Sequence, residues 1–130
     1  MTLTTALTAA DVSIPALAAS GSPISLPGRL MLPENAHGLV LFAHGSGSSR
    51  LSPRNQFVAG ILHESWLGTL LFDLLTERES LDRVNVFDIG LLAERLAAAI
   101  RFVAGREQTA ALPLGLFGAS TGAAAALVAA

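Results

Sequence analysis

The sequence contains no cysteine, and because it also contains no lysine, all eight of its basic residues are arginine. The lack of cysteine excludes disulfide bonds, thiolate metal sites and a cysteine nucleophile. The lack of lysine excludes a Walker-type phosphate-binding lysine, a Schiff-base lysine and a Ser-Lys catalytic dyad. Three histidines are present, His37, His44 and His63, but they lack the paired spacing of a zinc site, so we expect no bound metal.

Charged residues are also scarce, at 14% of the 130 residues, whereas hydrophobic residues make up 52%. Globular domains usually contain about 25% charged residues. This composition excludes a disordered chain, and the length fits one domain at most. The formal net charge is -2 and the charges are scattered. A nucleic-acid-binding protein would have a basic stripe, so we expect no nucleic-acid partner.

Signals for export or membrane insertion are lacking as well. The first basic residue is Arg29, so residues 1–17 have no positive region ahead of an apolar run, which predicts a cytoplasmic location. Residues 108–130 carry no charge and are long enough to span a bilayer. A proline and three glycines interrupt them, however, and much of the rest is weakly apolar alanine. We therefore expect no membrane-spanning segment.

The order of apolar runs and helical patterns predicts an α/β fold with a mostly parallel sheet flanked by helices. Residues 11–17 and 24–32 have the pattern of two strands joined by a turn, and their prolines suit edge positions. Further strands are expected at residues 38–43, 68–74 and 112–117. Helices are expected at residues 54–66, at about 88–104 and over the Ala-rich segment 123–130.

The segment from Asp88 to Ala104 has the clearest helical pattern. Its apolar residues recur at steps of three and four, which places them on one face. Asp88 can cap the first turn and Gly105 can end the helix. The charged residues are then expected on the wetter sides. The apolar face consists of Ile89, Leu92, Leu96, Ile100 and Val103, and the charged residues are Glu94, Arg95 and Arg101.

The helix expected at residues 54–66 has a weaker pattern. Phe57, Ile61 and Leu62 lie on one of its faces, and we expect His63 and Glu64 to be solvated. Residues 75–87 are charged, which is typical of an exposed excursion.

The last residues of the chain have no helix stop signal. Residues 123–130 contain no capping glycine, no basic residue and no following turn. A helix that covers a strand rarely ends a domain in this way. We therefore expect residues 1–130 to be the N-terminal portion of a single, larger domain that is truncated shortly after Ser120.

The motif Gly118-Ala119-Ser120-Thr121-Gly122 matches the pattern G-x-S-x-G, with an expected strand before it and an Ala-rich helix after it. In this strand–turn–helix context the pattern is typical of a nucleophile held on a sharp turn. Such a turn forces strained dihedrals on the serine, so we expect a positive φ at Ser120 and glycines close by. The N–H of Thr121 could then face a developing oxyanion. The alternative is an ordinary Gly/Ser turn between a strand and a helix.

A second Gly/Ser-rich segment, residues 44–50, follows the strand expected at 38–43. Glycines at this position allow backbone N–H groups to point into the crevice where open α/β sheets bind ligands. In an acyl-transfer enzyme this loop supplies the other oxyanion donor, for which the amide of Ser46 is our candidate. We expect the loop to lie close to Ser120 and His44 to order it. The alternative is phosphate binding by the same loop, which the absence of lysine and of G-x-G-x-x-G weakens.

These segments together resemble the dienelactone-hydrolase-like branch of the α/β-hydrolase superfamily. The resemblance covers roughly residues 24–130 and rests on HGSGSSR, SPRN, FDLL, FDIGLLAERL and LPLGLFGASTGAAAAL. It implies an α/β-hydrolase fold and a serine hydrolase for small esters, thioesters or lactones, with no metal or organic cofactor. Ser120 matches the nucleophile, and Ser46 and Thr121 match the oxyanion positions. Some members of this branch are fused to a phosphoribosyltransferase domain.

The resemblance has two departures. Dienelactone hydrolases proper have cysteine as the nucleophile, where this chain has Ser120. In this fold the acid and the histidine of the triad follow the nucleophile, but no acidic residue or histidine follows Ser120. We expect both downstream of this chain. Two arginines near the 44–50 loop, Arg50 and Arg54, are candidates for holding an anionic substrate group, and Asp73 is interpreted as a turn or cap carboxylate.

Two other functional classes stay open from the sequence alone. One is a non-catalytic α/β domain that binds a ligand or a partner with an incomplete site. The other is a nucleotide-binding α/β domain that uses the 44–50 loop.

Overall fold

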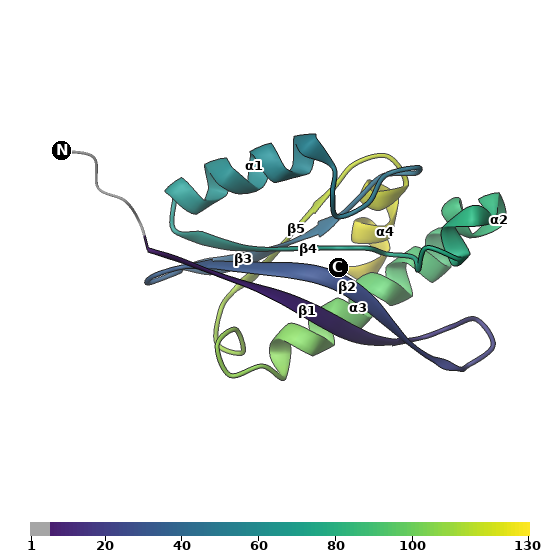
Figure 1. The fold of residues 1–130 in the computed structure, drawn as a ribbon, viewed down its shortest axis with the longest axis horizontal. Helices are drawn as coiled ribbons and strands as arrows, with labels where there is room; N and C mark the ends of the chain where they lie inside the picture. Colours follow the sequence, from purple (N-terminus) through teal and green to yellow (C-terminus); the bar gives the residue numbers. More distant parts are fainter. Residues whose placement is uncertain (1–5) are drawn as a thin grey trace.

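The computed structural model describes residues 6–130, which form one sheet with helices on both of its faces (Figure 1). Residues 1–5 of the predicted domain lie outside the described residues. The five strands have the order β1-β2-β4-β3-β5. They are β1 (Leu7–Leu17), β2 (Pro23–Pro33), β3 (Gly38–Ala43), β4 (Leu67–Phe72) and β5 (Leu114–Gly118). The helices are α1 (Pro53–Glu64), the 3₁₀ helix η1 (Glu79–Leu81), α2 (Arg83–Val86), α3 (Ile89–Ala104) and α4 (Thr121–Ala129).

The α/β fold is confirmed, and its sheet is mixed. β3 pairs in parallel with β4 and with β5, whereas the β1–β2 and β2–β4 pairs are antiparallel. The β1–β2 pair is antiparallel because the short turn at residues 18–22 joins the two strands, and a short connection can only return the chain antiparallel. The parallel strands β4, β3 and β5 end at the same edge of the sheet, so the three loops that follow these strands start there.

The expected edge position is right for β1 and wrong for β2, which lies between β1 and β4. A proline is tolerated inside the sheet here because of the register. The pairing of β2 with β4 starts at Gly28, opposite Phe72, and ends at Met31. Pro27, which has no N–H to donate, lies just outside that paired stretch.

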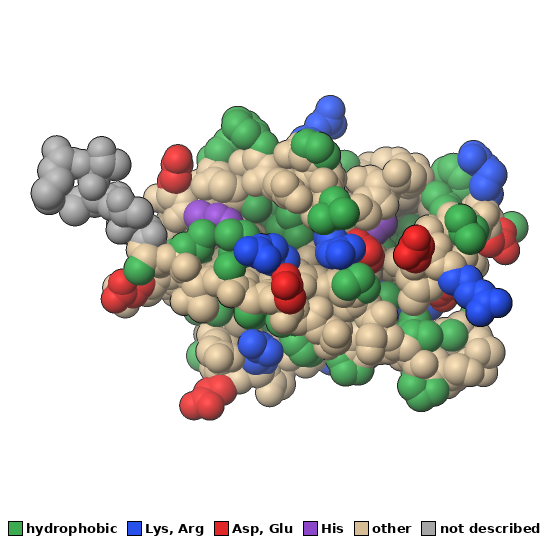
Figure 2. All heavy atoms as spheres, viewed as in Figure 1, with side chains coloured by type: hydrophobic (Ala, Val, Ile, Leu, Met, Phe, Trp, Pro, Cys, Tyr) green, Lys and Arg blue, Asp and Glu red, His purple; other side chains and the backbone are tan. Residues whose placement is uncertain are grey.

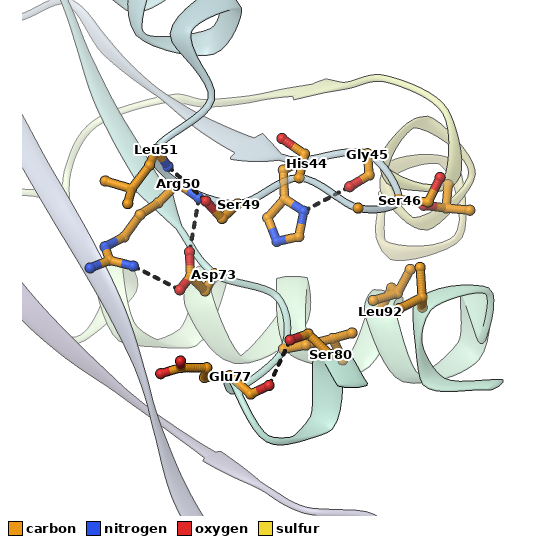
Figure 3. A pocket seen from close by; sticks show the side chains of 15 residues that line it. His44, Gly45, Ser46, Ser49, Arg50, Leu51, Asp73, Glu77, Ser80 and Leu92 are labelled. Atoms are coloured by element: carbon orange, nitrogen blue, oxygen red, sulfur yellow. Dashed lines mark hydrogen bonds and ion pairs between the residues drawn. The ribbon is translucent and has the colours of Figure 1, made fainter. Parts of the chain in front are cut away.

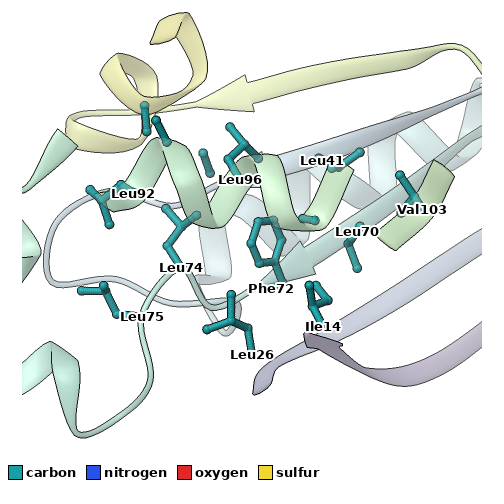
Figure 4. Close-up of a cluster of buried hydrophobic side chains, with 14 of the residues drawn as sticks. Ile14, Leu26, Leu41, Leu70, Phe72, Leu74, Leu75, Leu92, Leu96 and Val103 are labelled. Carbon is teal, nitrogen blue, oxygen red and sulfur yellow. The ribbon is translucent and has the colours of Figure 1, made fainter. Parts of the chain in front are cut away.

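The larger apolar core lies between the sheet and α3 (Figure 4). The predicted apolar face of α3 is confirmed: Leu92, Leu96 and Val103 are buried in this core. The caps are also confirmed, since the Asp88 carboxylate accepts from the Leu91 N–H at 3.0 Å and Gly105 ends the helix.

Arg95 departs from the prediction that it lies on a wetter side of α3. Its side chain is only 1% exposed. The position is three residues from Leu92 and therefore lies beside the apolar stripe. Arg95 is buried there because Glu79, from outside the helix, supplies a carboxylate partner.

Helix α1 covers the opposite face of the sheet, over a smaller cluster of Phe42, Ala59 and Leu71. The three apolar residues expected on one face of α1 do not share one environment. Leu62 packs against the cluster, while Phe57 is 71% and Ile61 50% exposed. Small Ala59 lets the helix approach the sheet, and Phe57 and Ile61 then lie on the outer side.

The surface mixes charges of both signs with apolar side chains, and Figure 2 shows arginines and carboxylates interspersed over one face. Within residues 6–130, no helix is both long enough and apolar enough to cross a membrane.

His63, at the end of α1, is partly buried rather than solvated as predicted. Its Nε2 lies 2.8 Å from the Oγ1 of the buried Thr69. This burial lowers the pKa of His63 below its ordinary value, because it disfavours the charged imidazolium.

We expect His63 to make the fold sensitive to mild acid. A group with a lowered pKa in the folded state stabilises the fold above its ordinary pKa, about 6.5 for histidine, and that stabilisation is lost as the pH falls towards the lowered value. The free energy of unfolding, measured by urea denaturation, should therefore decrease as the pH is lowered from about 7.5 to about 5. His63→Gln should flatten this fall, and His37→Gln, at an exposed histidine, should not. Equal pH dependence in the wild type and His63→Gln would contradict the assignment.

Candidate active site

Ser120 lies on the sharp turn between β5 and α4. Its backbone dihedrals are φ 57° and ψ -131°, a combination that L-residues rarely adopt. The positive φ expected from the glycine spacing is therefore confirmed. Ser120 is exposed, at the sheet edge where the parallel strands end. Strain of this kind is kept where the surrounding structure enforces it, and it is often found at functional sites.

The glycines on either side of Ser120 are required by close backbone contacts. A Cβ on Gly118 would lie 2.6 Å from the Gly122 carbonyl oxygen. A Cβ on Gly122 would collide with the carbonyl oxygens of Ala43 and His44. No flexible side chain is available to yield at these contacts. The predicted steric reason for the glycines is thus confirmed, and the turn is packed directly against the end of β3.

The 44–50 loop lies against this turn. β3 and β5 are neighbouring parallel strands, so the loops that follow them leave the sheet at the same edge. Ser46 Oγ is 3.4 Å from Ser120 Oγ, and a Cβ on Gly45 would lie 3.2 Å from the Ser120 Cβ. The predicted proximity of the loop and Ser120 is confirmed.

His44 has hydrogen-bonding partners at both ring nitrogens. The Leu74 N–H donates to Nε2 at 2.9 Å, so Nε2 is unprotonated and the proton is on Nδ1. Nδ1 lies 3.0 Å from the Gly45 carbonyl oxygen and donates to it. The imidazole is buried and holds the loop to the end of β4. This arrangement matches the expected role of His44 in ordering the loop and leaves neither nitrogen free to act as a base.

Asp73, just after β4, fastens the other end of the loop. Its Oδ1 accepts from the Arg50 N–H and its Oδ2 from Arg50 Nη1, each at 2.8 Å. This carboxylate anchors the loop to the end of β4 through Arg50, instead of closing a turn or capping a helix as interpreted from the sequence. The charge of Arg50 is compensated, and Figure 3 shows its guanidinium turned away from Ser46. Arg50 lines the cavity beside the loop, whereas Arg54 is exposed on the first turn of α1 and does not line it. The substrate role of the two arginines stays a prediction.

A cavity of about 540 Å³ lies beside the 44–50 loop (Figure 3); Ser46 and Thr121 line it, and Ser120 itself does not. This volume is in the range of small-molecule sites. The loop forms one side, and Thr121 lines it next to Ser120. The opposite wall of the cavity was not predicted as part of the site. Most of this wall follows β4, at the edge where open α/β sheets generally bind ligands, and that position is a signal from which it could have been predicted. This wall includes Leu75, Glu77, Ser80, Val86 and Leu92.

The structure thus brings Ser46, Ser120 and Thr121 together and leaves Arg54 apart. Among residues 6–130, no three His, Asp or Glu side chains cluster closely enough to hold a metal ion.

Comparison with solved structures gives strong similarity. A dienelactone hydrolase from Anabaena variabilis ATCC 29413 superposes with a TM-score of 0.84 and 46% identity, over 95% of this chain and 57% of that chain. A cold-adapted esterase from an Arctic intertidal metagenomic library has a TM-score of 0.72 and 18% identity, over 95% of this chain and 55% of that one. Because the esterase is only 18% identical to this chain, its similarity shows the fold alone.

Comparison with curated proteins gives a longer relative. A protein of Mycobacterium tuberculosis (strain ATCC 25618 / H37Rv), which carries the provisional name of a phosphoribosyl transferase, is 56% identical over 108 residues, 83% of this chain and 24% of its own length. The chain therefore spans about a quarter of the length of the curated relatives that it matches. No protein-family model matches the chain. From its strand order, its serine turn and its likeness to the Anabaena enzyme, the chain has an α/β-hydrolase fold of the dienelactone-hydrolase-like type.

Proposed function

We propose that this chain carries the nucleophile and the oxyanion hole of a serine hydrolase for small esters, thioesters or lactones. The observation that carries the proposal is Ser120 at a positive φ on the strand-to-helix turn, with the 44–50 loop packed against it. Ser120 Oγ attacks the carbonyl carbon while a general base takes its proton and passes it to the leaving alcohol or thiol. Water then attacks the acyl-enzyme, which releases the acid and returns the proton to Ser120.

The N–H groups of Ser46 and Thr121 are the proposed oxyanion donors. Thr121 is the first residue of α4, and the first N–H groups of a helix have no intrahelical acceptor. For Ser46, the orientation of one peptide group supports the role. In a planar trans peptide the C=O and N–H point in opposite directions. His44 Nδ1 holds the Gly45 C=O, so the Ser46 N–H points away from the imidazole.

The general base and the acid of the triad are proposed to lie outside residues 6–130. His44 is bonded at both ring nitrogens, and His63 is bonded to Thr69 at the end of α1. The relatives are much longer than this chain, and in this fold the acid and the histidine follow the serine.

Ester turnover tests the proposal directly. The protein extended along its reading frame should hydrolyse p-nitrophenyl acetate, and the 130-residue chain alone should give little or no Ser120-dependent rate, because a serine hydroxyl is a weak nucleophile without a base. Enzyme-like turnover by the short chain, lost in Ser120→Ala, would instead make one of its three histidines the base.

His44→Leu tests the oxyanion loop. The variant removes the donor that orients the Gly45–Ser46 peptide and leaves the buried Leu74 N–H without its acceptor. We expect kcat to fall by about 10²–10³-fold, the size of one lost oxyanion donor, and the free energy of unfolding to fall by about 1–3 kcal/mol. His44→Gln keeps a donor and an acceptor and should lose less. An unchanged kcat in folded His44→Leu would contradict the role of the loop.

The geometry does not favour nucleotide binding by the 44–50 loop. The side chain of Ser46 faces Ser120, and the loop is fastened at both ends by His44 and Asp73. The transferase name belongs to relatives of which this chain covers a quarter.

A further inference from the structure

Arg95 is a buried charge at the centre of α3, and Glu79 binds it with both carboxylate oxygens. Arg95 Nη1 donates to Glu79 Oε1 at 2.7 Å, and Nη2 donates to Oε2 at 2.6 Å. Nη1 also lies 3.2 Å from the Leu74 carbonyl oxygen and donates to it. The guanidinium holds the pKa of Glu79 below its ordinary value, so the pair stays ionised at neutral pH.

Glu79 is also the centre of the segment that forms the far wall of the cavity. Its Oε1 accepts from the Thr76 N–H at 3.0 Å, and its own N–H donates to Thr76 Oγ1 at 3.1 Å. Its carbonyl oxygen accepts from Asn85 Nδ2 at 3.1 Å. Residues 76–85 are therefore tied together at Glu79, and Glu79 is tied to α3 through Arg95.

Between Leu75 and Val86, which pack in and against the core, the wall segment 76–85 has few apolar anchors. The large apolar residues at its centre face solvent, with Leu81 82% and Val84 73% exposed. Ser80 lines the cavity from this segment. The position of residues 76–85 between these two anchors thus depends on Glu79 and its pairing with Arg95.

The loop side of the site is held mainly by other contacts, although Arg95 also donates to the Leu74 carbonyl oxygen. Leu74 is fully buried, and its N–H is held by His44. Loss of the Arg95–Glu79 pair should therefore displace residues 76–85 of the wall and leave the 44–50 loop and Ser120 in place.

We propose that Arg95 and Glu79 are positioning residues. By fixing the wall, they set the depth of the cavity in which the acyl chain of the substrate would bind, and hence the acyl-chain length that the enzyme prefers. This inference rests on the proposed hydrolase function. A long acyl chain would reach the wall at Leu75, Ser80 and Val86, whereas an acetyl group would stay beside Ser120. Fixing the wall in advance lowers the cost of ordering it when a long substrate binds.

The test compares two esters in the protein extended along its reading frame. The double variant Arg95→Met with Glu79→Gln removes both charges together, so that no unpaired charge is left buried and the fold should persist. KM for p-nitrophenyl hexanoate should rise by about tenfold, while kcat and KM for the acetate should stay within about twofold, because the lost contacts are binding contacts to the chain. Arg101→Met, at an exposed arginine of the same helix, is the matched control and should change neither ester.

Hydrogen exchange tests the positioning role of the pair without relying on hydrolase activity. Amides of residues 76–82 should exchange faster in the double variant, while those of α3 stay protected. An unchanged hexanoate-to-acetate ratio in the folded double variant, or unchanged exchange over 76–82, would overturn the inference. If hydrolysis proves independent of Ser120, the proposed function and the chain-length role both fail, and exchange alone decides whether the pair positions the wall.

Discussion

Ser120→Ala is expected to reduce kcat for p-nitrophenyl acetate by about 10⁴–10⁶-fold in the protein extended along its reading frame. The substitution removes the atom that we propose forms the acyl-enzyme, and the oxyanion donors alone would supply just a residual rate. The fold should be unaffected, because Ser120 is exposed and its hydroxyl contacts Ser46 only at 3.4 Å. Turnover and circular dichroism of the same preparations measure the two effects.

Ser46→Ala is the matched control for this loss. Ser46 is proposed to act through its main-chain N–H, which alanine retains, so kcat should stay within about tenfold of the wild type. Equal losses in both variants would place the chemistry on the Ser46 hydroxyl, and an active Ser120→Ala would remove the nucleophile assignment.

Gly122→Ala should have the largest effect on stability. The new methyl group would overlap the carbonyl oxygens of Ala43 and His44, and backbone atoms cannot move aside as a flexible side chain would. We expect a loss of about 3–5 kcal/mol in the free energy of unfolding, at the upper end for an overpacked site. The start of α4 would have to move away from β3, so activity should fall with stability. Urea denaturation measures the first effect and ester turnover the second.

Gly60→Ala gives the comparison. Gly60 lies in α1, and a Cβ there meets no atom within 4 Å. Alanine should stabilise this helix by about 0.5–1 kcal/mol. A Gly122→Ala protein as stable as the wild type would show that α4 is not packed against β3 as described.

The parts of the site that follow from local chemistry could be predicted from the sequence. The glycine spacing around Ser120 predicts its positive φ, since only small neighbours fit so sharp a turn. The apolar run of β3 predicts a buried strand, which places the 44–50 loop beside that turn once β3 and β5 pair in parallel.

The parts that depend on distant partners could not be predicted. Arg95 reads as a surface residue of an amphipathic helix, and only Glu79, 16 residues away, allows it to be buried. The partial burial of His63 could not be predicted either, because it is set by how closely α1 packs on the sheet. The prolines of β2 suggest an edge strand, and only the register of its pairing with β4, which starts after Pro27, lets β2 lie inside the sheet.

Covalent labelling with a fluorophosphonate tests the central claim most directly. The reagent reacts with an activated serine and remains bound as a phosphonyl ester, which mass spectrometry assigns to one residue. In the protein extended along its reading frame we predict one adduct, on Ser120, formed more slowly in His44→Leu and absent from Ser120→Ala. An adduct on Ser46, or an unlabelled protein that still hydrolyses esters, would contradict the account.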